Sequence, residues 1–216
     1  MKTAILLGAS GLVGGYVLEY LLNDDTYEKV IVLSRKNSNQ PHPKKQELII
    51  NFDELEQHKN ELKADVVFCC LGTTISKAGS KEAFKKVDYE YPLKVAEIAK
   101  QNGAKSYLLI SALGASKSSI VFYNQVKGEV ENAIQQLQFD AFHILQPSLI
   151  IGERKEARFT EGIAQKISPI LDGVLVGYLS KYKSIKAEQI AKAMVHYSKQ
   201  NKQGTFKHDS KDLQQV

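Results

Sequence analysis

Near its beginning the chain reads Thr3-Ala4-Ile5-Leu6-Leu7-Gly8-Ala9-Ser10-Gly11-Leu12-Val13-Gly14. A short apolar run therefore leads directly into a GxxGxxG sequence. Apolar residues then recur at the spacing of a helix up to Asn23 and Asp24, namely Val13, Val17, Leu18, Leu21 and Leu22. A strand, a glycine turn and a helix in immediate succession form the opening of a βαβ unit, and this decides the fold.

The three glycines of this turn have separate roles. Gly8 permits a tight turn, Gly11 lets the backbone approach a pyrophosphate, and Gly14 lets the helix pack closely on the strand. The helix N-terminus supplies N–H groups and a positive dipole to the phosphates. We therefore expect a dinucleotide cofactor at this turn, held by Gly8, Ser10, Gly11, Leu12, Val13 and Gly14.

The rest of the chain continues the alternation of strands and helices. Strands are expected at 30–33, 47–50, 66–70, 107–110 and 142–145, and helices at 81–101, 119–137 and 187–198. Pro92 marks a bend or a join within the helical region 81–101. This alternation predicts an α/β, Rossmann-type fold, a doubly wound parallel sheet with helices on both faces and a ligand crevice at the C-terminal ends of the strands.

We expect one domain over residues 1–216. A short polar helix should begin at Asp53, and residues 205–206 should close the sheet. The irregular stretch 153–182 is interpreted as a small cap on the substrate side of the crevice. Length, a 43% share of hydrophobic residues and a 25% share of charged residues are those of an ordinary soluble domain.

Composition argues against several other classes of protein. No apolar run approaches the roughly 20 residues that a membrane span needs. The net charge is +5, but the lysines are scattered, so we expect no specific nucleic-acid binding. The five histidines show no metal-ligand spacing, so no metal is expected, and His143 is interpreted as a core residue. Adjacent Cys69 and Cys70 cannot form an unstrained disulfide with each other, which favours a cytoplasmic location.

The end of the second strand indicates which dinucleotide binds. NAD-specific sites place a carboxylate there for the ribose 2′-hydroxyl. This chain instead reads Leu33-Ser34-Arg35-Lys36. A guanidinium suits a 2′-phosphate, because it offers a forked and permanently charged partner. Arg35, helped by Lys36, therefore predicts NADP(H), although an ordinary solvated basic turn has the same composition.

A YxxxK spacing occurs at Tyr123-Asn124-Gln125-Val126-Lys127. Residues four apart lie on one face of a helix, so the ammonium stands near the phenol and helps it exchange a proton. Ser111, at the end of the preceding strand, could polarise a substrate carbonyl. The same spacing recurs from Tyr182 to Lys186, but Tyr123 is preferred because it lies between two predicted strands. We therefore take Ser111, Tyr123 and Lys127 as the candidate catalytic set.

These residues resemble the short-chain dehydrogenase/reductase superfamily. The resemblance is closer still to its atypical branch, the Tat-interacting-protein-type NADP-binding oxidoreductases and their bacterial relatives. Besides the glycine turn, the blocks that carry the resemblance are Cys69-Cys70-Leu71-Gly72-Thr73-Thr74, Ser111-Ala112-Leu113-Gly114-Ala115, Tyr123 to Glu129 and Gln146 to Arg154.

The resemblance implies further cofactor contacts. Leu71, Gly72, Thr73 and Thr74 would line the cofactor beside the fourth strand, and Asp53 would lie near the adenine. Pro147, Leu149 and Ile150 would face the nicotinamide, and Lys127 would also hold its ribose. One departure is that the family tends to carry two serines in tandem after the fifth strand, whereas this chain has Ala112 second, leaving Ser111 as the sole candidate.

Two functions fit this sequence. The first is an NADPH-dependent carbonyl reductase, in which Tyr123 donates the proton, Lys127 assists it and Ser111 orients a small carbonyl substrate. The second is an NADP(H)-sensing binding protein that carries out little chemistry and has a protein partner. The sequence leaves the oligomeric state undecided between a monomer and a homodimer that pairs through the helices near 81–101 and 119–137. Relatives that act on nucleotide sugars have a large C-terminal substrate domain. This chain is too short for such a domain, so we expect no sugar-nucleotide epimerase activity.

Overall fold

The computed structural model describes residues 1–152 and 183–216 of the chain. Within these residues one seven-stranded sheet has the order β3-β2-β1-β4-β5-β6-β9, and all of its neighbouring strands are parallel. The strands are β1 (Lys2–Leu7), β2 (Tyr27–Ser34), β3 (Lys45–Ile49), β4 (Val66–Cys69), β5 (Ser106–Ile110), β6 (Ala141–Gln146) and β9 (Gly204–Asp209). The chain winds outward from β1 to one edge and then from β4 to the other, which confirms the predicted doubly wound sheet.

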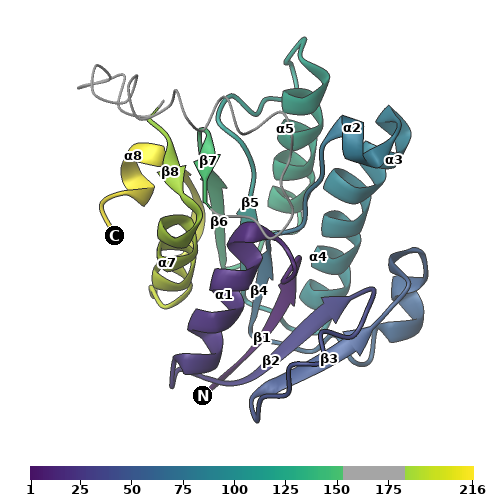
Figure 1. Cartoon of the computed structure of the whole chain (residues 1–216), viewed down its shortest axis with the longest axis vertical. Helices are drawn as coiled ribbons and strands as arrows, with labels where there is room; N and C mark the ends of the chain where they lie inside the picture. Colours follow the sequence, from purple (N-terminus) through teal and green to yellow (C-terminus); the bar gives the residue numbers. More distant parts are fainter. Residues whose placement is uncertain (153–182) are drawn as a thin grey trace.

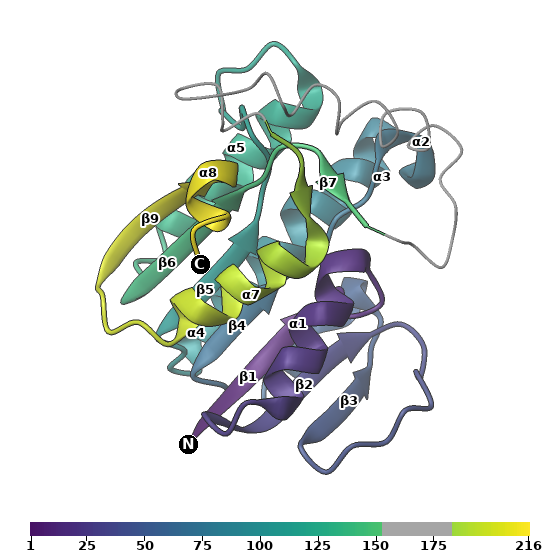
Figure 2. The ribbon, with the colours of Figure 1, turned by 60° about the vertical axis from the view of Figure 1, so that its left-hand side comes forward.

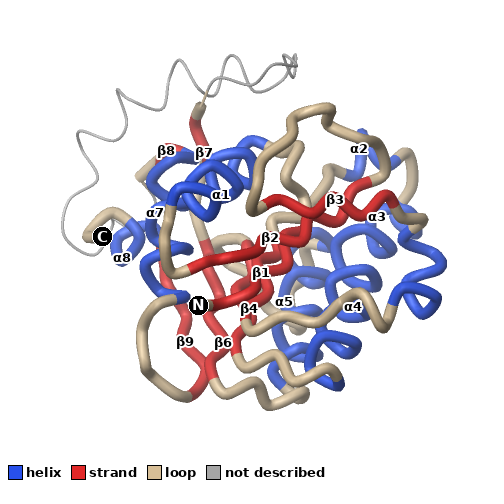
Figure 3. Tube along the Cα trace, turned by 90° about the horizontal axis from the view of Figure 1, so that it is seen from below, coloured by secondary structure: helices blue, strands red, loops and turns tan. Residues whose placement is uncertain are grey.

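Helices cover both faces of this sheet. Helices α1 (Leu12–Asn23) and α7 (Ala187–Ser198) lie side by side on one face, and α4 (Tyr91–Gln101) and α5 (Phe122–Gln135) lie on the other (Figures 1 and 2). Seen from below, the strands run between these two helical layers (Figure 3). The crevice side of the molecule is the upper edge of the sheet in Figure 1, where the parallel strands end.

Residues 4–7 of the central strand β1 are apolar because both of its faces are buried there. In β1, Ile5 and Leu7 belong to the hydrophobic core under α4 and α5, whereas Ala4 and Leu6 belong to the core under α1 and α7. All four side chains are completely buried. Because side chains alternate across a strand, one continuous apolar run contributes residues to two hydrophobic cores.

The predicted helix over 81–101 is divided into three parts. It begins as α3 (Lys81–Lys85), widens into a π-helical turn, η2 (Lys86–Glu90), and continues as α4. Pro92 lies just inside α4, and a proline lacks the N–H of a regular helix and crowds the carbonyl four residues earlier. The expected join is therefore present, and it takes the form of a π turn that contains Asp88.

The helix predicted over 119–137 begins three residues later than expected, at Phe122. Serines that precede it bond to local backbone groups instead: the Ser119 hydroxyl accepts from the Val121 N–H, and the Ser116 hydroxyl accepts from the Ser118 N–H. The other short helices are η1 (Phe52–His58), which is the short polar helix predicted from Asp53, and α2 (Ile75–Ala78), which the sequence pattern did not indicate.

The C-terminal part adds β9 to the edge of the sheet, as predicted for residues 205–206. Helix α7 has the bounds expected from its periodicity, and α8 (Ser210–Leu213) follows β9. Strands β7 (Ile150–Ile151) and β8 (Ile185–Lys186) form a separate parallel pair. The predicted cap over 153–182 lies outside the described residues. Within the described part of the chain, no helix is long and apolar enough to cross a membrane.

Glycines at the start of the fold are required by close backbone packing. Gly8 has a φ of +80°, and a Cβ there would lie 2.5 Å from the Cys70 carbonyl oxygen. A Cβ on Gly14 would lie 2.1 Å from the Gly8 carbonyl oxygen. No side chain fits between these backbone segments, so the turn, the start of α1 and the end of β4 are held against one another.

Gly14→Ala should destabilise the fold by about 2 to 3 kcal/mol, because the added methyl group meets backbone that cannot move away cheaply. Gly15→Ala is the matched control, since its Cβ would meet only the Ala9 carbonyl oxygen at 3.7 Å. Alanine there should raise stability by up to about 1 kcal/mol through helix propensity. Urea unfolding of the two variants measures the contrast, and equal effects would contradict it.

Candidate functional site

The predicted site residues follow the C-terminal ends of four strands of the sheet. The glycine turn follows β1, residues 71–74 follow β4, Ser111 follows β5 and residues 147–150 follow β6. These segments come together: Gly8 packs on Cys70, and a Cβ on Gly152 would lie 3.2 Å from the Leu12 side chain. The tertiary structure thus gathers the predicted residues along one edge of the sheet.

The start of α1 suits an anionic group. Gly11, which carries no side chain, is the N-cap residue, and the first turn contains Leu12, Val13 and Gly14, none of which is acidic. The Gly11 N–H donates to the Gly8 carbonyl at 2.9 Å, which closes the turn ahead of the helix. The positive end of the helix dipole therefore faces the crevice without a competing carboxylate. These residues fit the pyrophosphate of a dinucleotide.

The basic residues after β2 lie on the surface. Arg35 and Lys36 are exposed, and Arg35 makes no ion pair with any residue that the structure describes. A carboxylate next to this turn is that of Glu47 on β3, which accepts from the Ser34 hydroxyl at 3.2 Å and which the sequence pattern did not single out. Its oxygens accept from the Ser38 hydroxyl at 2.9 Å and from Lys45 Nζ at 3.3 Å. This acid is therefore already paired, while the guanidinium is available.

Partial burial opposes ionisation of Glu47, but its hydrogen bonds from Ser38 and Lys45 outweigh that effect and lower its pKa.

The carboxylate of Asp53, at the start of η1, is also bonded to other side chains. Lys86 Nζ and the Tyr91 hydroxyl both lie 2.7 Å from its Oδ1 atom. This ties η1 to the η2–α4 region, and the adenine contact implied for Asp53 stays a prediction.

Lys127 forms a buried ion pair with Asp88. The Nζ and Oδ1 atoms are 2.7 Å apart, and the two side chains are 5% and 0% exposed. The other carboxylate oxygen of Asp88 accepts from the Thr73 N–H at 2.9 Å. A Cβ on Gly72 would lie 3.3 Å from Asp88 and 3.7 Å from Lys127 Nζ. Asp88 therefore joins the lysine of α5 to the turn after β4.

The protonation of this pair follows from its surroundings. Burial disfavours the ammonium of Lys127, but the Asp88 carboxylate outweighs that cost and raises its pKa above the ordinary value. Lys127 is thus a fixed cation at neutral pH. Because Asp88 compensates its charge locally, the field that the ammonium exerts on neighbouring groups is weaker than the sequence spacing alone indicates.

Tyr123 lies one helical turn before Lys127, as the spacing predicts, and is half-buried. Its ring packs against Phe84 with centroids 5.5 Å apart, and it interacts electrostatically with Lys127. The face of α5 that carries both residues is held in place by Gly128, where a Cβ would lie 2.2 Å from the Ser116 backbone. The structure therefore confirms that phenol and ammonium share one face of α5.

Ser111 is buried and its hydroxyl is already bonded. It donates to Glu131 Oε1. Glu131 is itself buried and accepts from Gln146 Nε2 at 2.8 Å and from Lys207 Nζ at 2.9 Å. Ser111 is thus part of a polar network that connects α5, β5, β6 and β9, which the sequence did not indicate.

The segment after β6 is held by backbone contacts. The Pro147 carbonyl accepts from the Leu113 N–H, and the Leu149 carbonyl accepts from the Ile185 N–H, both at 2.9 Å. Leu149 is 40% exposed and Ile150 half-buried. The segment therefore leaves apolar side chains at the edge of the sheet where a cofactor ring would lie, and its predicted contact with nicotinamide stays a prediction.

Two buried acids, Asp88 and Glu131, were missed. Asp88 occupies a position in phase with Phe84, Val95 and Ala99, so a charged residue interrupts an apolar stripe. Glu131 continues the Tyr123–Lys127 spacing by four residues. Both signals were present, because an acid at a buried helical position needs a partner. The alternative Tyr182 lies outside the described residues.

Comparison with known proteins gives three findings. The sequence model of the "NAD dependent epimerase/dehydratase family" matches residues 4–121. The chain is 37% identical over 169 residues to "Protein HTATIP2" of Rattus norvegicus, covering 76% of this chain and 69% of that protein. It is 32% identical over 212 residues to "Protein FMP52, mitochondrial" of Candida albicans, covering 95% and 91%.

Solved structures of low sequence identity share the fold. A UDP-N-acetylglucosamine 4-epimerase from Methanobrevibacter ruminantium superposes with a TM-score of 0.71 at 17% identity, covering 96% of this chain and 76% of that one. The Bordetella bronchiseptica enzyme WbmH, solved in complex with NAD+, gives 0.72 at 15% identity, covering 97% and 76%.

Asp88→Asn should lower the free energy of unfolding by about 3 to 5 kcal/mol, because it leaves the Lys127 ammonium buried without a counter-charge. Asp88→Asn combined with Lys127→Met removes both charges and should recover most of that loss. Urea unfolding at pH 7 measures both. If the single variant is as stable as the wild type, the pair does not hold this region together.

Proposed function

The chain belongs to the NAD dependent epimerase/dehydratase family, and from this premise we propose that it is an NADPH-dependent oxidoreductase that reduces a small carbonyl compound. One observation carries the proposal. Tyr123 and Lys127 share a helix face, and the Asp88 pair anchors that face to the Gly72–Thr73 turn, at the sheet edge where the glycine turn also lies.

The cofactor would be held by groups already in place. The glycine turn and the start of α1 would take the pyrophosphate, and Gly72 would let the cofactor approach the end of β4. Arg35 would bind the 2′-phosphate, because its guanidinium is exposed and the nearby Glu47 is neutralised by Lys45. Lys127 would donate from its ammonium to the nicotinamide ribose.

The chemistry of the site is proton transfer beside a fixed cation. When bound, the nicotinamide supplies the hydride that carbonyl reduction requires. Tyr123 donates the proton to the carbonyl oxygen, and Lys127 stabilises the phenolate that remains. Asp88 is a positioning residue that keeps the ammonium on this face of α5. Because the Asp88–Lys127 pair is net neutral, its contribution depends on orientation more than on overall charge.

Ser111 would act within this mechanism only through the Glu131 network. Its hydroxyl donates to Glu131, so its oxygen lone pairs, but not its proton, are available to a substrate. A carbonyl oxygen needs a donor, and Ser111 can supply one only if the Glu131 bond is exchanged for one to the substrate. This departure from a free catalytic serine motivates a second candidate function.

We propose as the second candidate an NADP(H)-sensing protein with little catalysis, whose cofactor occupancy sets its affinity for a protein partner. The observation that favours it is the engagement of Ser111 by buried Glu131. For either function we propose a cytoplasmic location, because Cys69 and Cys70 are both free thiols, as a reducing compartment would keep them.

Arg35→Glu should weaken NADPH binding by more than about tenfold, because a charge-assisted pair is replaced by repulsion of the 2′-phosphate. NADH binding should hardly change, since NADH lacks that phosphate. Lys105→Glu makes an equal change of charge at an exposed position before β5 and should leave both affinities intact. Titration followed by nicotinamide fluorescence gives the dissociation constants. An NADPH affinity unaltered by Arg35→Glu would show that Arg35 does not select NADPH over NADH.

Tyr123→Phe should lower kcat by about 10² to 10⁴-fold, because the proton donor is lost, while NADPH affinity stays within about twofold of the wild type. NADPH oxidation with a panel of aldehydes and ketones measures kcat. Full turnover by Tyr123→Phe would eliminate the proposed donor. Absence of wild-type turnover together with an NADPH-dependent partner pull-down would favour the sensing function.

A further inference from the structure

The loop after β2, which carries the exposed residues Arg35 and Lys36, is held at both of its ends by one carboxylate. Glu47 Oε1 accepts from the Ser34 hydroxyl at 3.2 Å, and Glu47 Oε2 accepts from the Ser38 hydroxyl at 2.9 Å. The Ser38 N–H lies 3.1 and 3.2 Å from the two carboxylate oxygens. Because Ser34 is the last residue of β2, Glu47 closes the loop that contains Arg35.

Lys45 adds a cation to this arrangement. Its Nζ atom donates to Ser38 Oγ at 2.7 Å and lies 3.3 Å from Glu47 Oε2. Lys45 and Glu47 are two residues apart in β3, so their side chains project from the same face of that strand. The two side chains are 6% and 12% exposed, so solvent screens their interaction only weakly. We call the side chains of Ser34, Ser38, Lys45 and Glu47 the clamp.

The clamp uses the acceptor capacity of the Glu47 carboxylate. A carboxylate offers about four lone-pair sites. In the described part of the chain its donors are the Ser34 hydroxyl, the Ser38 N–H, the Ser38 hydroxyl and Lys45 Nζ. An acid at the end of the second strand would otherwise be the group that holds a ribose 2′-hydroxyl. Glu47 is therefore occupied in holding the loop and is not free to bind the ribose.

The guanidinium carried by the closed loop has no carboxylate partner. Arg35 is exposed and forms no ion pair with Glu47 or with any other acid in residues 1–152 and 183–216. The loop has two further bonds of its own. The Asn39 N–H donates to Asn37 Oδ1 at 2.8 Å, and Ser34 Oγ lies 2.9 Å from the Lys36 carbonyl oxygen. The backbone that carries Arg35 is thus ordered before any ligand binds.

We propose that Glu47 is a positioning residue that determines the preference for NADPH, because the clamp holds the backbone of Arg35 in place for the ribose 2′-phosphate. This inference rests on the proposed function, which assigns that phosphate to Arg35. A loop that is ordered in advance loses less conformational freedom on binding, so more of the charge-assisted attraction appears as affinity. NADH lacks the phosphate and gains nothing from the clamp.

Charge and position make opposite predictions for Glu47. A carboxylate near the 2′-phosphate repels it, so if charge alone decided, loss of this acid would tighten NADPH binding. If position decides, loss of the acid weakens NADPH binding. Removing Lys45 together with Glu47 takes away one cation and one anion, so the effect of position is measured without a change of net charge.

Lys45→Ala combined with Glu47→Ala, made in the full chain, removes the clamp. NADPH binding should weaken about five- to tenfold, and NADH binding should change by less than about twofold. Lys100→Ala combined with Asp140→Ala is the matched control. It also removes one cation and one anion, 4.0 Å apart, at the edge of the sheet where β6 begins, and it should leave both affinities unchanged. Titration followed by nicotinamide fluorescence measures the dissociation constants.

Ser38→Ala tests the clamp without changing a charge. It removes the hydroxyl that bonds to both Glu47 and Lys45, so NADPH binding should weaken about threefold while NADH binding stays unchanged. Ser38 is an exposed loop residue, so this variant decides the matter even if the double variant fails to fold. Urea unfolding shows which variants are folded.

Arg35→Ala shows whether the clamp acts through the guanidinium. In that background, removal of the clamp should weaken NADPH binding by less than about twofold further. Unchanged or tighter NADPH binding without the clamp, an equal loss of NADH affinity, or a full additional loss in the Arg35→Ala background would overturn the proposal.

Arg35→Glu separates this proposal from the proposed function. If Arg35→Glu leaves NADPH affinity unaltered, the cofactor assignment is wrong and the role of the clamp is wrong with it. If Arg35→Glu weakens NADPH binding but the clamp variants do not, only the role of the clamp is wrong.

Discussion

Three backbone segments of this protein approach one another more closely than any side chain would allow. The Gly8 carbonyl faces the start of α1 at Gly14, and Gly8 itself rests on the Cys70 carbonyl at the end of β4. This contact fixes the N-terminus of α1 over the point where the winding of the sheet changes direction. The position of this helix end beside the crevice depends on it. A larger residue at Gly8 or Gly14 would separate the elements that form the site.

The lysine of the candidate catalytic set depends on a second constraint, the burial of charge. An ammonium in the interior is tolerated only with a counter-charge, and Asp88 supplies it from a π-helical turn on another element. Pro92 disturbs the regular helix at this place, which connects a backbone irregularity to the position of a functional side chain. The pair couples α5 to the turn after β4, so the placement of a candidate catalytic residue and the stability of the fold depend on one interaction.

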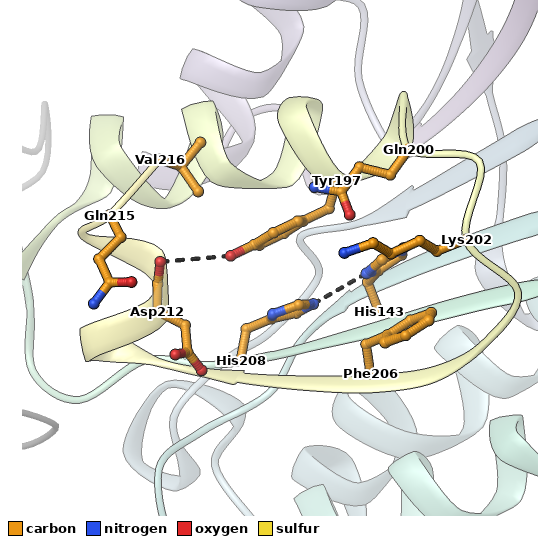
Figure 4. Close-up of a pocket in the computed structure, with 9 residues that line it drawn as sticks. All are labelled: His143, Tyr197, Gln200, Lys202, Phe206, His208, Asp212, Gln215 and Val216. Atoms are coloured by element: carbon orange, nitrogen blue, oxygen red, sulfur yellow. Dashed lines mark hydrogen bonds between the residues drawn. The ribbon is translucent and has the colours of Figure 1, made fainter.

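Helix α5 carries a series of polar residues along one face. Tyr123, Lys127 and Glu131 follow one another at intervals of one turn, and each has a different partner: Phe84, Asp88 and Ser111. Glu131 extends the network to Gln146 and Lys207, and thereby to the edge strand β9. The same edge carries the stacked rings of His143 and His208 on the α7 side (Figure 4). Among the described residues, buried Glu131 and His143 thus lie on the β6 and β9 side of the sheet, whereas buried Asp88 and Lys127 lie at the turn after β4.

The sequence by itself determined the features that depend on local pattern. The glycine turn, the buried parallel strands, the bounds of α7 and the sharing of one face by Tyr123 and Lys127 all follow from spacing and residue type, and each was predicted. The basic turn at Arg35 was visible in the same way. Only the tertiary structure decided which charges meet. Asp88 pairs with Lys127, and Glu131 takes the hydroxyl of Ser111, because packing brings together elements distant in the chain. Spacing along a helix specifies which residues share a face, but the partner across that face depends on how the layers pack.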